Sequence, residues 1–284
     1  RTMGAVTLTA SKPNYHRGFF PLLGGVTHVP FPDPYRPILQ SRPGEDYGET
    51  VVRYIEEEIL YKVVPPDEVA GFVIEPIQGE GGYILPAPGF FPALRKLCDR
   101  YGILLIADEV QSGVGRTGKW WAIQNFGVEP DIICAAKGIA SGMPLGAMVA
   151  RKHLVTWPRG AHGNTYGGNP LSCAAAIATL DLVASEYASN AAKVGEHFMG
   201  RLRELQTDFP CIGEVRGRGL LIGVELYPEA GGARRYCEAL ASAGLLCKET
   251  HDNVIRFAPP LIIGTKDLDW AFEKIKDVFA RLEN

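Results

Sequence analysis

The 284-residue sequence has no strong excess of either charge. Its 29 lysines and arginines are balanced by 32 acidic residues, which gives a formal net charge of -3. It also contains neither a basic stripe nor a long run of like charges. Binding to nucleic acid or to an anionic membrane surface needs concentrated positive charge, so the composition favours a small-molecule partner over both.

Cysteines and histidines at short, regular spacing are also missing. The six cysteines lie far apart, mostly in apolar segments, and none belongs to a CxxC motif: Cys98, Cys134, Cys173, Cys211, Cys237 and Cys247. The six histidines show no metal-ligand spacing. These absences argue against a disulfide scaffold and a zinc site, and they favour a reduced, cytoplasmic protein without a bound metal.

Long apolar runs and dinucleotide-binding motifs are absent as well. We find no stretch that is long enough to cross a bilayer, and the N-terminus lacks the charged-then-apolar pattern of a signal peptide. No GxGxxG motif leads from a strand into a helix, which argues against a nicotinamide site. We therefore expect a protein without a membrane span, long enough to bury a large core.

Strands and helices alternate through the first two thirds of the chain. Short apolar runs predict strands over residues 71–74, 102–107, 131–135 and 145–150. Amphipathic repeats predict helices over residues 49–63, 88–101, 169–185 and 191–207. Strands separated by such helices predict an α/β fold with a mostly parallel sheet. Before them, residues 3–10 alternate like a strand and residues 13–43 are expected to be a long irregular excursion.

The pattern changes after residue 207. Short strands are expected over residues 212–226, 245–248 and 254–257, with helices over residues 233–243 and 266–282. This order predicts a smaller α+β domain after the parallel sheet. We therefore expect a large domain over residues 1–207 and a small C-terminal domain over residues 208–284.

Two charged residues follow predicted strands. Lys137 comes after the apolar run of residues 131–135, and a lysine in dry surroundings has a lowered pKa and can form a Schiff base with a carbonyl. Asp108 follows the strand of residues 102–107, at the end that faces the ligand crevice in open α/β sheets, where it can pair with a bound cation. The alternatives are a Lys137 that extends to water, and Asp108 and Glu109 as caps of a turn.

Five segments, in family order, resemble the class III aminotransferases, particularly the 4-aminobutyrate and acetylornithine aminotransferase branch. They are residues 75–82, 108–118, 132–147, 163–170 and 256–261, and the resemblance runs nearly end to end. It implies a fold-type I transferase that depends on pyridoxal 5'-phosphate. It also implies that Lys137 holds this cofactor and that Asp108 pairs with the protonated ring nitrogen, which keeps the ring an electron sink.

The resemblance gives roles to five further residues. Val110 would pack against the cofactor ring, and Gln111 would lie beside its 3'-oxygen. Thr165 would reach the phosphate of the cofactor in a neighbouring subunit, which implies a homodimer or a dimer of dimers. Glu80 would pair with Arg256 and move aside for a dicarboxylate, because the planar arginine side chain grips a carboxylate. The alternatives are that Glu80 is an exposed turn residue, that Arg256 forms a structural ion pair, and that Thr165 only takes part in the start of a helix.

The implied activity is transfer of an amino group from an ω-amino acid, such as 4-aminobutyrate, to 2-oxoglutarate. The amino donor and the keto-acid acceptor react in turn, in a ping-pong mechanism with Lys137 as general base and acid. A racemase or decarboxylase of the same family and a non-catalytic protein stay open as alternatives. The family's glycine- and serine-rich phosphate loop is not found in the sequence, so we expect a longer enzyme, of which this chain alone binds cofactor weakly.

Overall fold

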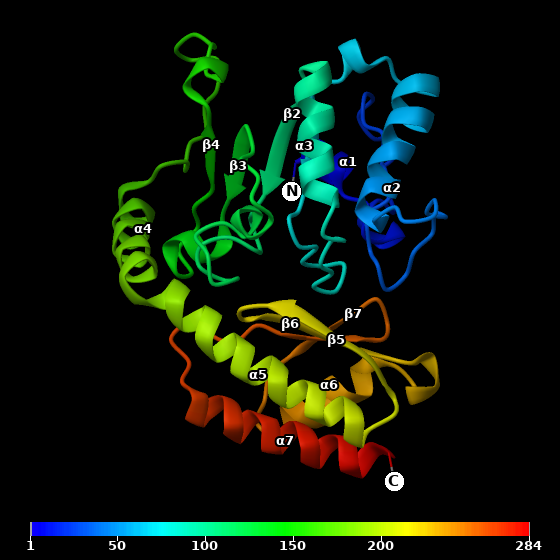
Figure 1. The fold of residues 1–284 in the computed structure, drawn as a ribbon. Coiled ribbons are helices and arrows are strands. Elements are labelled where there is room, and N and C mark those ends of the chain that lie inside the picture. Colours follow the sequence, from blue (N-terminus) through cyan, green and yellow to red (C-terminus); the bar gives the residue numbers. More distant parts are fainter. Residues whose placement is uncertain (1, 284) are drawn as a thin grey trace. The chain divides into compact units, whose positions relative to one another are not determined.

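The computed structural model describes residues 2–283. The chain forms two compact units (Figure 1). Unit 1 comprises Arg1–Val73 and Pro86–Leu105, and unit 2 comprises Ile74–Leu85 and Ile106–Asn284. The predicted domain boundary after residue 207 lies inside unit 2 and stays a prediction. All seven predicted site residues belong to unit 2.

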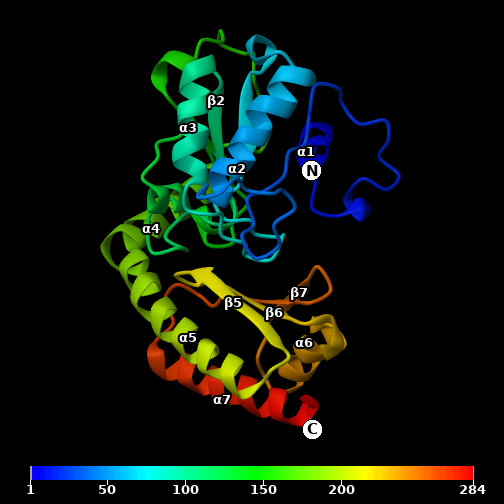
Figure 2. The ribbon, with the colours of Figure 1, turned by 45° about the vertical axis from the view of Figure 1, so that its right-hand side comes forward.

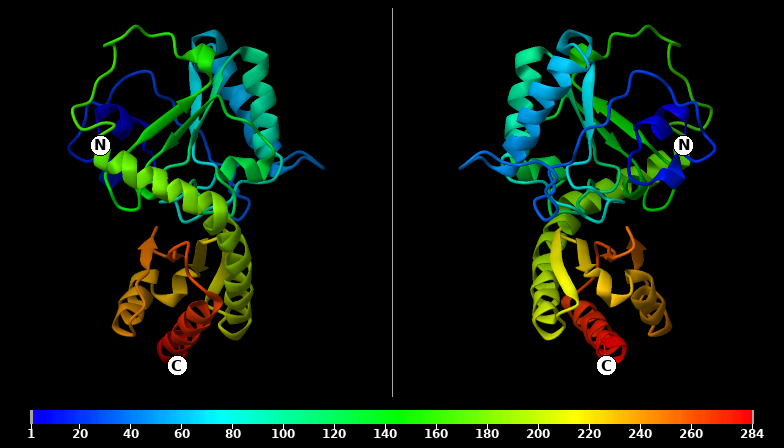
Figure 3. Two further views of the ribbon diagram at one scale, coloured as in Figure 1. Left: turned by 90° about the vertical axis from the view of Figure 1, so that its left-hand side faces the viewer. Right: turned by 90° about the vertical axis from the view of Figure 1, so that its right-hand side faces the viewer.

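A helix pair forms the centre of unit 1. Helix α2 (Tyr47–Tyr54) continues through a π-helical turn, η2 (Ile55–Leu60), and lies beside α3 (Phe90–Tyr101) (Figure 3). The side chain of Asp46 accepts hydrogen bonds from the N–H groups of Gly48 and Gly89, at 2.8 and 3.0 Å, and so joins the starts of both helices. A Cβ at Gly48 would lie 2.3 Å from the nitrogen of Phe90, so glycine permits this approach. The two helices predicted here are confirmed.

The N-terminal segment corrects one expectation. Met3–Leu8 form a helix, α1, instead of a strand, and the hydroxyl of Thr2 accepts a hydrogen bond from the N–H of Ala5 at its start. Alternation over so few residues is a weak strand signal, which this helix cap overrides. The segment between α1 and α2 contains the 3-10 turn η1 (Pro13–Tyr15) and is otherwise irregular, as expected.

The first sheet has the strand order β1-β2-β3-β4. Its strands are β1 (Gly71–Ile74), β2 (Leu104–Asp108), β3 (Ile132–Ala135) and β4 (Ala147–Ala150). β2 and β3 are parallel, and β4 is antiparallel to β3. The sheet is therefore mixed, because the connection from β3 to β4 is too short for the crossover that a parallel neighbour requires. Short 3-10 helices lie in the connections of the chain: η3 (Pro66–Glu68), η4 (Ala122–Phe126), η5 (Lys137–Ala140), η6 (Lys152–Leu154) and η8 (Pro228–Ala230).

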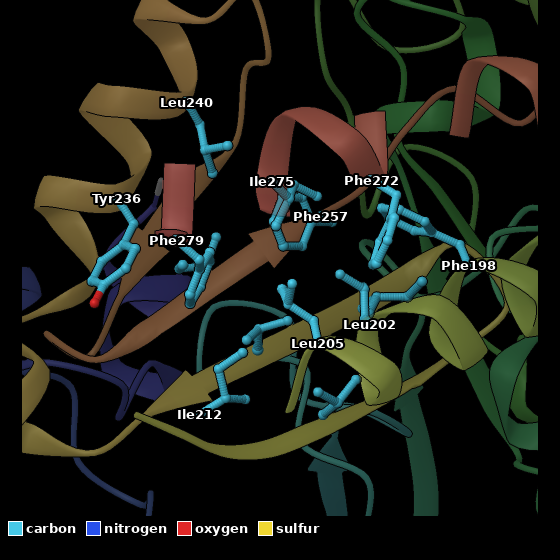
Figure 4. Close-up of a cluster of buried hydrophobic side chains, with 14 of the residues drawn as sticks. Phe198, Leu202, Leu205, Ile212, Tyr236, Leu240, Phe257, Phe272, Ile275 and Phe279 are labelled. Atoms are coloured by element: carbon cyan, nitrogen blue, oxygen red, sulfur yellow. The ribbon is translucent and has the colours of Figure 1, made fainter. Parts of the chain in front are cut away.

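The second sheet lies wholly in unit 2 and is antiparallel, with the order β5-β6-β8-β7. Its strands are β5 (Ile212–Arg218), β6 (Leu221–Leu226), β7 (Lys248–Thr250) and β8 (Val254–Phe257). Helices α5 (Ala188–Asp208), α6 (Ala233–Ser242) and α7 (Thr265–Glu283) cover one face of it (Figure 2). Phe198, Phe257 and Phe279 belong to the buried core between helices and sheet (Figure 4). β7 begins at Lys248, where the predicted strand of residues 245–248 ends.

A long helix precedes this second sheet. Helix α4 (Pro170–Leu182) continues through a π-helical turn, η7 (Val183–Tyr187), into α5. Asn169 caps its start by accepting a hydrogen bond from the N–H of Ser172 at 2.9 Å. By length and composition alone this helix is apolar enough to cross a membrane, although we expected no such run. The alanine-rich α4 raises its apolar content, and one such helix is weak evidence for a membrane span.

Candidate active site

Strands β2 and β3 bring the two predicted catalytic residues to the same edge of the first sheet. Asp108 is the last residue of β2 and lies in register with Cys134 of β3. Lys137 follows the end of β3 after one residue, Ala136, and begins η5. Because β2 and β3 run parallel, their carboxyl ends meet at one edge, where α/β sheets place their ligands.

The backbone at Lys137 has an unusual conformation. Its φ angle is 47°, in the left-handed region that non-glycine residues rarely adopt. Ser141, at the end of η5, has a φ of 46°. Such backbone strain costs about 1–3 kcal/mol per residue and clusters at active sites and ligand clamps. The turn after β3 is therefore held in a shape that local sequence preference does not explain.

The exposure of Lys137 corrects the reasoning that singled it out. We expected dry surroundings, but the side chain is exposed. The apolar run before Lys137 forms β3, whose own residues are mostly half-buried, and the turn that follows exposes Lys137 while it buries Ile139. An apolar strand therefore does not bury the residue after it. The position of Lys137 is that of a site residue, although its side chain is not buried within this chain.

Asp108 and Glu109 have different surroundings. The Oδ1 atom of Asp108 accepts a hydrogen bond from the N–H of Val110 at 3.0 Å, so Asp108 also orders its own turn. Glu109 is 1% exposed and accepts hydrogen bonds from the hydroxyl of Ser112 at 2.6 Å and the N–H of Ile123 at 2.8 Å. Burial raises the pKa of Glu109, against these hydrogen bonds. Glu109 thus stabilises the loop after β2, and half-buried Asp108 is the better candidate for chemistry.

Gln111 packs against the glycine-rich segment of residues 78–82. A Cβ at Gly79 would lie 2.5 Å from the Cδ atom of Gln111, so a side chain at Gly79 would require the Gln111 amide to move. Val110 and Gln111 are both half-buried. The structure therefore places both residues at the end of β2 beside Asp108, and their predicted contacts with a cofactor stay predictions.

Glu75 is a site residue to which we gave no role from the sequence. It directly follows β1, and its Oε1 atom accepts a hydrogen bond from the N–H of Gly79 at 3.0 Å. Burial raises the pKa of Glu75 to about 7, and the hydrogen bond from Gly79 opposes this shift. The negative charge of Asp108 raises the pKa further, and the positive charge of Lys137 lowers it. Glu75 therefore shares the electrostatic environment of both predicted catalytic residues. The signal in the sequence was an acid directly after an apolar strand, the same signal that identified Asp108.

The predicted substrate residue Glu80 contacts the turn between β7 and β8. The hydroxyl of Thr250 lies 3.0 Å from Oε1 of Glu80 and 2.7 Å from its backbone oxygen. The Nε2 atom of His251 lies 3.5 Å from Oε2 of Glu80. Sequence reasoning missed Thr250 and His251 because they lie far from Glu80 along the chain and belong to none of the five family segments.

Arg256 lies on β8 against the same glycine-rich segment. Its Nη1 atom donates a hydrogen bond to the backbone oxygen of Gly79 at 3.1 Å, and its guanidinium carbon lies 5.5 Å from the ring centroid of Tyr83. Within residues 2–283, the Nε atom of Arg256 is buried without a hydrogen-bond partner. Arg256 thus contacts the glycine-rich segment that contains Glu80. A direct ion pair between Glu80 and Arg256 stays a prediction.

Thr165 lies in the exposed loop before α4. Asn164 orders this loop, because its Oδ1 atom accepts hydrogen bonds from the N–H groups of Tyr166 and Gly167, at 2.9 and 2.8 Å. The side chain of Thr165 is exposed. This agrees with helix-start chemistry, and a role of Thr165 toward a neighbouring subunit stays a prediction.

The residues at the edge of the first sheet fit pyridoxal 5'-phosphate. The exposed amine of Lys137 is accessible to an aldehyde, and the carboxylate of Asp108 at the neighbouring strand end suits a protonated ring nitrogen. Among the described residues, no group of three or more histidine, cysteine or acidic side chains is arranged to hold a metal ion. The fold and the site define a protein for a cofactor that carries both an aldehyde and a basic nitrogen.

Comparison with known proteins agrees with this class. The family model described as "Aminotransferase class-III" matches residues 1–279. The chain therefore belongs to the class III aminotransferases, whose cofactor is pyridoxal 5'-phosphate. It is 45% identical over 281 residues to the ornithine aminotransferase of Bacillus subtilis (strain 168), covering 98% of this chain and 63% of that protein. It is 43% identical over 283 residues to that of Geobacillus sp. (strain WCH70), covering 99% and 64%.

Solved transaminase structures share the fold. An (S)-enantioselective ω-transaminase from Thermomicrobium roseum matches with a TM-score of 0.89 and 33% identity, over 100% of this chain and 66% of that one. An amine transaminase from an uncultivated Pseudomonas species, solved with pyridoxal phosphate bound, matches with a TM-score of 0.87 and 34% identity, over 99% and 67%. The expected fold of pyridoxal-phosphate-dependent transaminases is thereby confirmed. The chain spans slightly less than two thirds of the length of the curated relatives named above.

Proposed function

We propose that this chain belongs to an enzyme that transfers the ω-amino group of an amino acid to 2-oxoglutarate. The observation that carries the proposal is the meeting of Lys137 and Asp108 at the carboxyl ends of two neighbouring parallel strands. Family membership supports the transaminase reaction, and the ω-amino position is supported by the names of the relatives. A retained amine and carboxylate at this edge also favour an enzyme over a non-catalytic protein.

Each residue of the site has a chemical task in this proposal. Pyridoxal phosphate, when bound, withdraws electrons from the substrate carbon. The Nζ atom of Lys137 would hold the cofactor through its aldehyde and, when free, would take the proton from the substrate carbon as general base and deliver it to the cofactor carbon as general acid. The carboxylate of Asp108 keeps a proton on the ring nitrogen. Arg256 grips a carboxylate of the substrate through its planar guanidinium.

The amino donor that we propose first is ornithine. The relatives that match over nearly the whole chain are ornithine aminotransferases, whereas the sequence alone suggested 4-aminobutyrate. Both donors present an ω-amino group on an aliphatic chain that ends in a carboxylate. Ornithine has one more carbon in its chain and an additional α-amino group, so a direct comparison of the two donors tests the assignment.

Two half-reactions test the proposal. The protein with bound cofactor is mixed with ornithine, 4-aminobutyrate or an α-amino acid, and the absorbance change of the cofactor is followed. We expect a fast change with ornithine, and recovery of the original spectrum when 2-oxoglutarate is added. Release of carbon dioxide, or inversion of the α-carbon without need for an acceptor, would instead identify a decarboxylase or a racemase.

We further propose a homodimer in the cytoplasm. The six cysteines are free, which supports a reducing compartment. Exposed Thr165 beside the start of α4 supports a shared site, because helix N-termini and free hydroxyls bind phosphate. Mixing Thr165→Ala subunits with Lys137→Ala subunits tests the sharing. Partial recovery of activity in the mixture is expected, and two inactive parents that stay inactive when mixed would contradict it.

A further inference from the structure

The turn between β7 and β8 is unusual in shape and in position. Thr250 ends β7 and is 1% exposed, although it is polar. His251 and Asp252 follow with φ angles of 45° and 61°, both in the left-handed region. The positive φ angles suit the tight hairpin that joins the two strands, whereas the buried hydroxyl of Thr250 needs a hydrogen-bond partner.

The turn contacts Glu80, one of the two predicted substrate residues. Thr250 places its hydroxyl 3.0 Å from one carboxylate oxygen of Glu80, and His251 places Nε2 3.5 Å from the other. Thr250 also lies 2.7 Å from the backbone oxygen of Glu80. Both ends of the glutamate, its backbone and its carboxylate, are therefore held by the turn.

Arg256 has a hydrogen-bond donor without a partner among the described residues. It donates from Nη1 to the oxygen of Gly79, the residue before Glu80. Its buried Nε atom has no hydrogen-bond partner among the residues that the structure describes. A buried donor of this kind is costly unless a partner arrives, and a carboxylate is the partner that guanidinium groups bind best. With Glu80 held by Thr250 and His251, Arg256 is available to the carboxylate of a substrate.

We propose that Thr250 and His251 are specificity-determining positioning residues, which form a resting place for the Glu80 carboxylate and so keep Arg256 available to dicarboxylates. This inference rests on the proposed function and deepens it, because it explains how one site serves two kinds of substrate. When Glu80 leaves the resting place, it competes with the substrate carboxylate for Arg256. The strength of the contacts of Thr250 and His251 with Glu80 then sets the relative affinity of the site for the dicarboxylate acceptor and for the amino donor.

Glutarate is the probe for this balance, because it has two carboxylates and neither an amino nor a keto group. Its dissociation constant from the cofactor-loaded protein is measured by calorimetry for Thr250→Val and for the matched control Thr250→Ser, which retains the hydroxyl. Loss of a hydrogen bond to a charged group predicts a dissociation constant about tenfold higher for Thr250→Val, with Thr250→Ser close to wild type. Equal affinities for wild type and Thr250→Val would overturn the proposal.

His251 is tested by His251→Asn, because asparagine tolerates the left-handed conformation while its side chain is shorter. We expect a smaller rise in the dissociation constant than for Thr250→Val, since the contact is longer. In the half-reactions, the loss of affinity should be larger for 2-oxoglutarate than for ornithine in both variants. A loss that is equal for both substrates would show a general disturbance of the site and would contradict the resting place.

A double-mutant cycle separates this role from a structural one. In a Glu80→Ala background the resting place has no occupant, so Thr250→Val should leave the dissociation constant for glutarate unchanged. A tenfold loss that persists in this background would overturn the inference. Because glutarate binding requires no turnover, the cycle gives its answer separately from the ornithine half-reaction, whose failure would overturn the proposed function alone.

Discussion

Ionisable side chains gather where the strands of the first sheet end, and their surroundings set their tasks. Glu75, Asp108 and Lys137 follow or end three successive strands of the sheet. The strand-end rule predicted Asp108 and Lys137 from the sequence, since apolar runs followed by a charge are visible without a structure. The same rule could have identified Glu75, which directly follows β1. The exposure of Lys137 was not predictable, because burial depends on chain segments that lie far away in sequence.

Lys137→Ala should abolish the reducible link between protein and cofactor. The physical reason is that a covalent link to an aldehyde needs an amine at this strand end. Borohydride reduction followed by peptide mass mapping is the measurement, with the exposed Lys152 as the matched control site. Finding the cofactor on Lys152 in the wild-type protein would show that the assignment of Lys137 is wrong.

Glu75 should make the folded chain less stable as pH rises. Burial raises its pKa from 4.5 to about 7, so the folded state keeps a proton that the unfolded chain releases. Between these two values the contribution of Glu75 to the free energy of unfolding falls with rising pH, in total by on the order of 3 kcal/mol. We expect Glu75→Gln, which keeps an acceptor for the N–H of Gly79, to be more stable than wild type above about pH 7.

Urea unfolding of the cofactor-free chain at both ends of this pH range measures the effect. The difference between Glu75→Gln and wild type should be small near pH 4.5 and largest above pH 7. A difference that is independent of pH would mean that the carboxyl of Glu75 does not titrate in this range. Lys137→Ala in the same assay should enlarge the difference, because the positive charge of Lys137 favours ionised Glu75.

At the scale of elements, periodicity predicted most helices and strands, and local chemistry decided the rest. The helices of unit 1 and the strands β1 and β8 lie where their apolar patterns placed them. Helix α1 was missed because a threonine cap outweighs a short alternating pattern. The antiparallel direction of β4 could have been predicted, because the expected strands over residues 131–135 and 145–150 leave too short a connection for a parallel crossover.

Helix α2 gives an element-scale prediction through Glu45. Its carboxylate accepts hydrogen bonds from Nε of Arg53 at 2.8 Å, the N–H of Arg42 at 3.0 Å and the hydroxyl of Thr50 at 2.9 Å. The bond from Arg53 contributes most to lowering the pKa of Glu45 to about 2. Its stabilisation is therefore present above pH 4.5 and lost as pH falls toward 2. Glu45→Gln should lower the free energy of unfolding at neutral pH by about 2 kcal/mol.

The matched control for Glu45→Gln is Glu57→Gln, in the π-helical turn η2 that continues α2. Glu57 also pairs with Arg53, at 3.4 Å, but its side chain is half exposed. Exposed pairs contribute little, so the expected loss for this control is about 0.5 kcal/mol. Chemical unfolding at neutral pH and near pH 3 compares the variants. A loss for Glu45→Gln that does not shrink in acid would contradict the role of the charge.

At the scale of the whole molecule, the predicted site residues all belong to one compact unit although they span most of the sequence. The sequence did not predict this grouping, because the expected domain boundary after residue 207 separates Arg256 from the other six site residues. The division into units was not predictable, since unit 2 takes in residues 74–85 from the middle of unit 1. Which segment joins which unit depends on packing, and local patterns do not report it.

Apolar side chains on α4 give a whole-molecule prediction. Leu171 and Ile177 are 68% and 64% exposed, and Met148 and Val149 of the edge strand β4 are also exposed. Exposed apolar surface and an open strand edge favour association. Leu171→Glu combined with Ile177→Glu should reduce self-association in sedimentation velocity. The control Leu246→Glu changes an 88% exposed leucine elsewhere in unit 2 and should have little effect. Equal sedimentation of all three proteins would contradict an association face on α4.

The close approach of Gly79 to Gln111 has a consequence for redesign of substrate preference. A side chain at Gly79 would require the amide of Gln111 to move, so substitutions at Gly79 are expected to disturb the predicted cofactor contact of Gln111. The turn between β7 and β8 offers a better target. His251 is exposed, and its position accepts asparagine or glycine without a change of backbone shape. A small library at His251 should therefore reach new acceptors with less disturbance of the predicted cofactor contact than any library at Gly79.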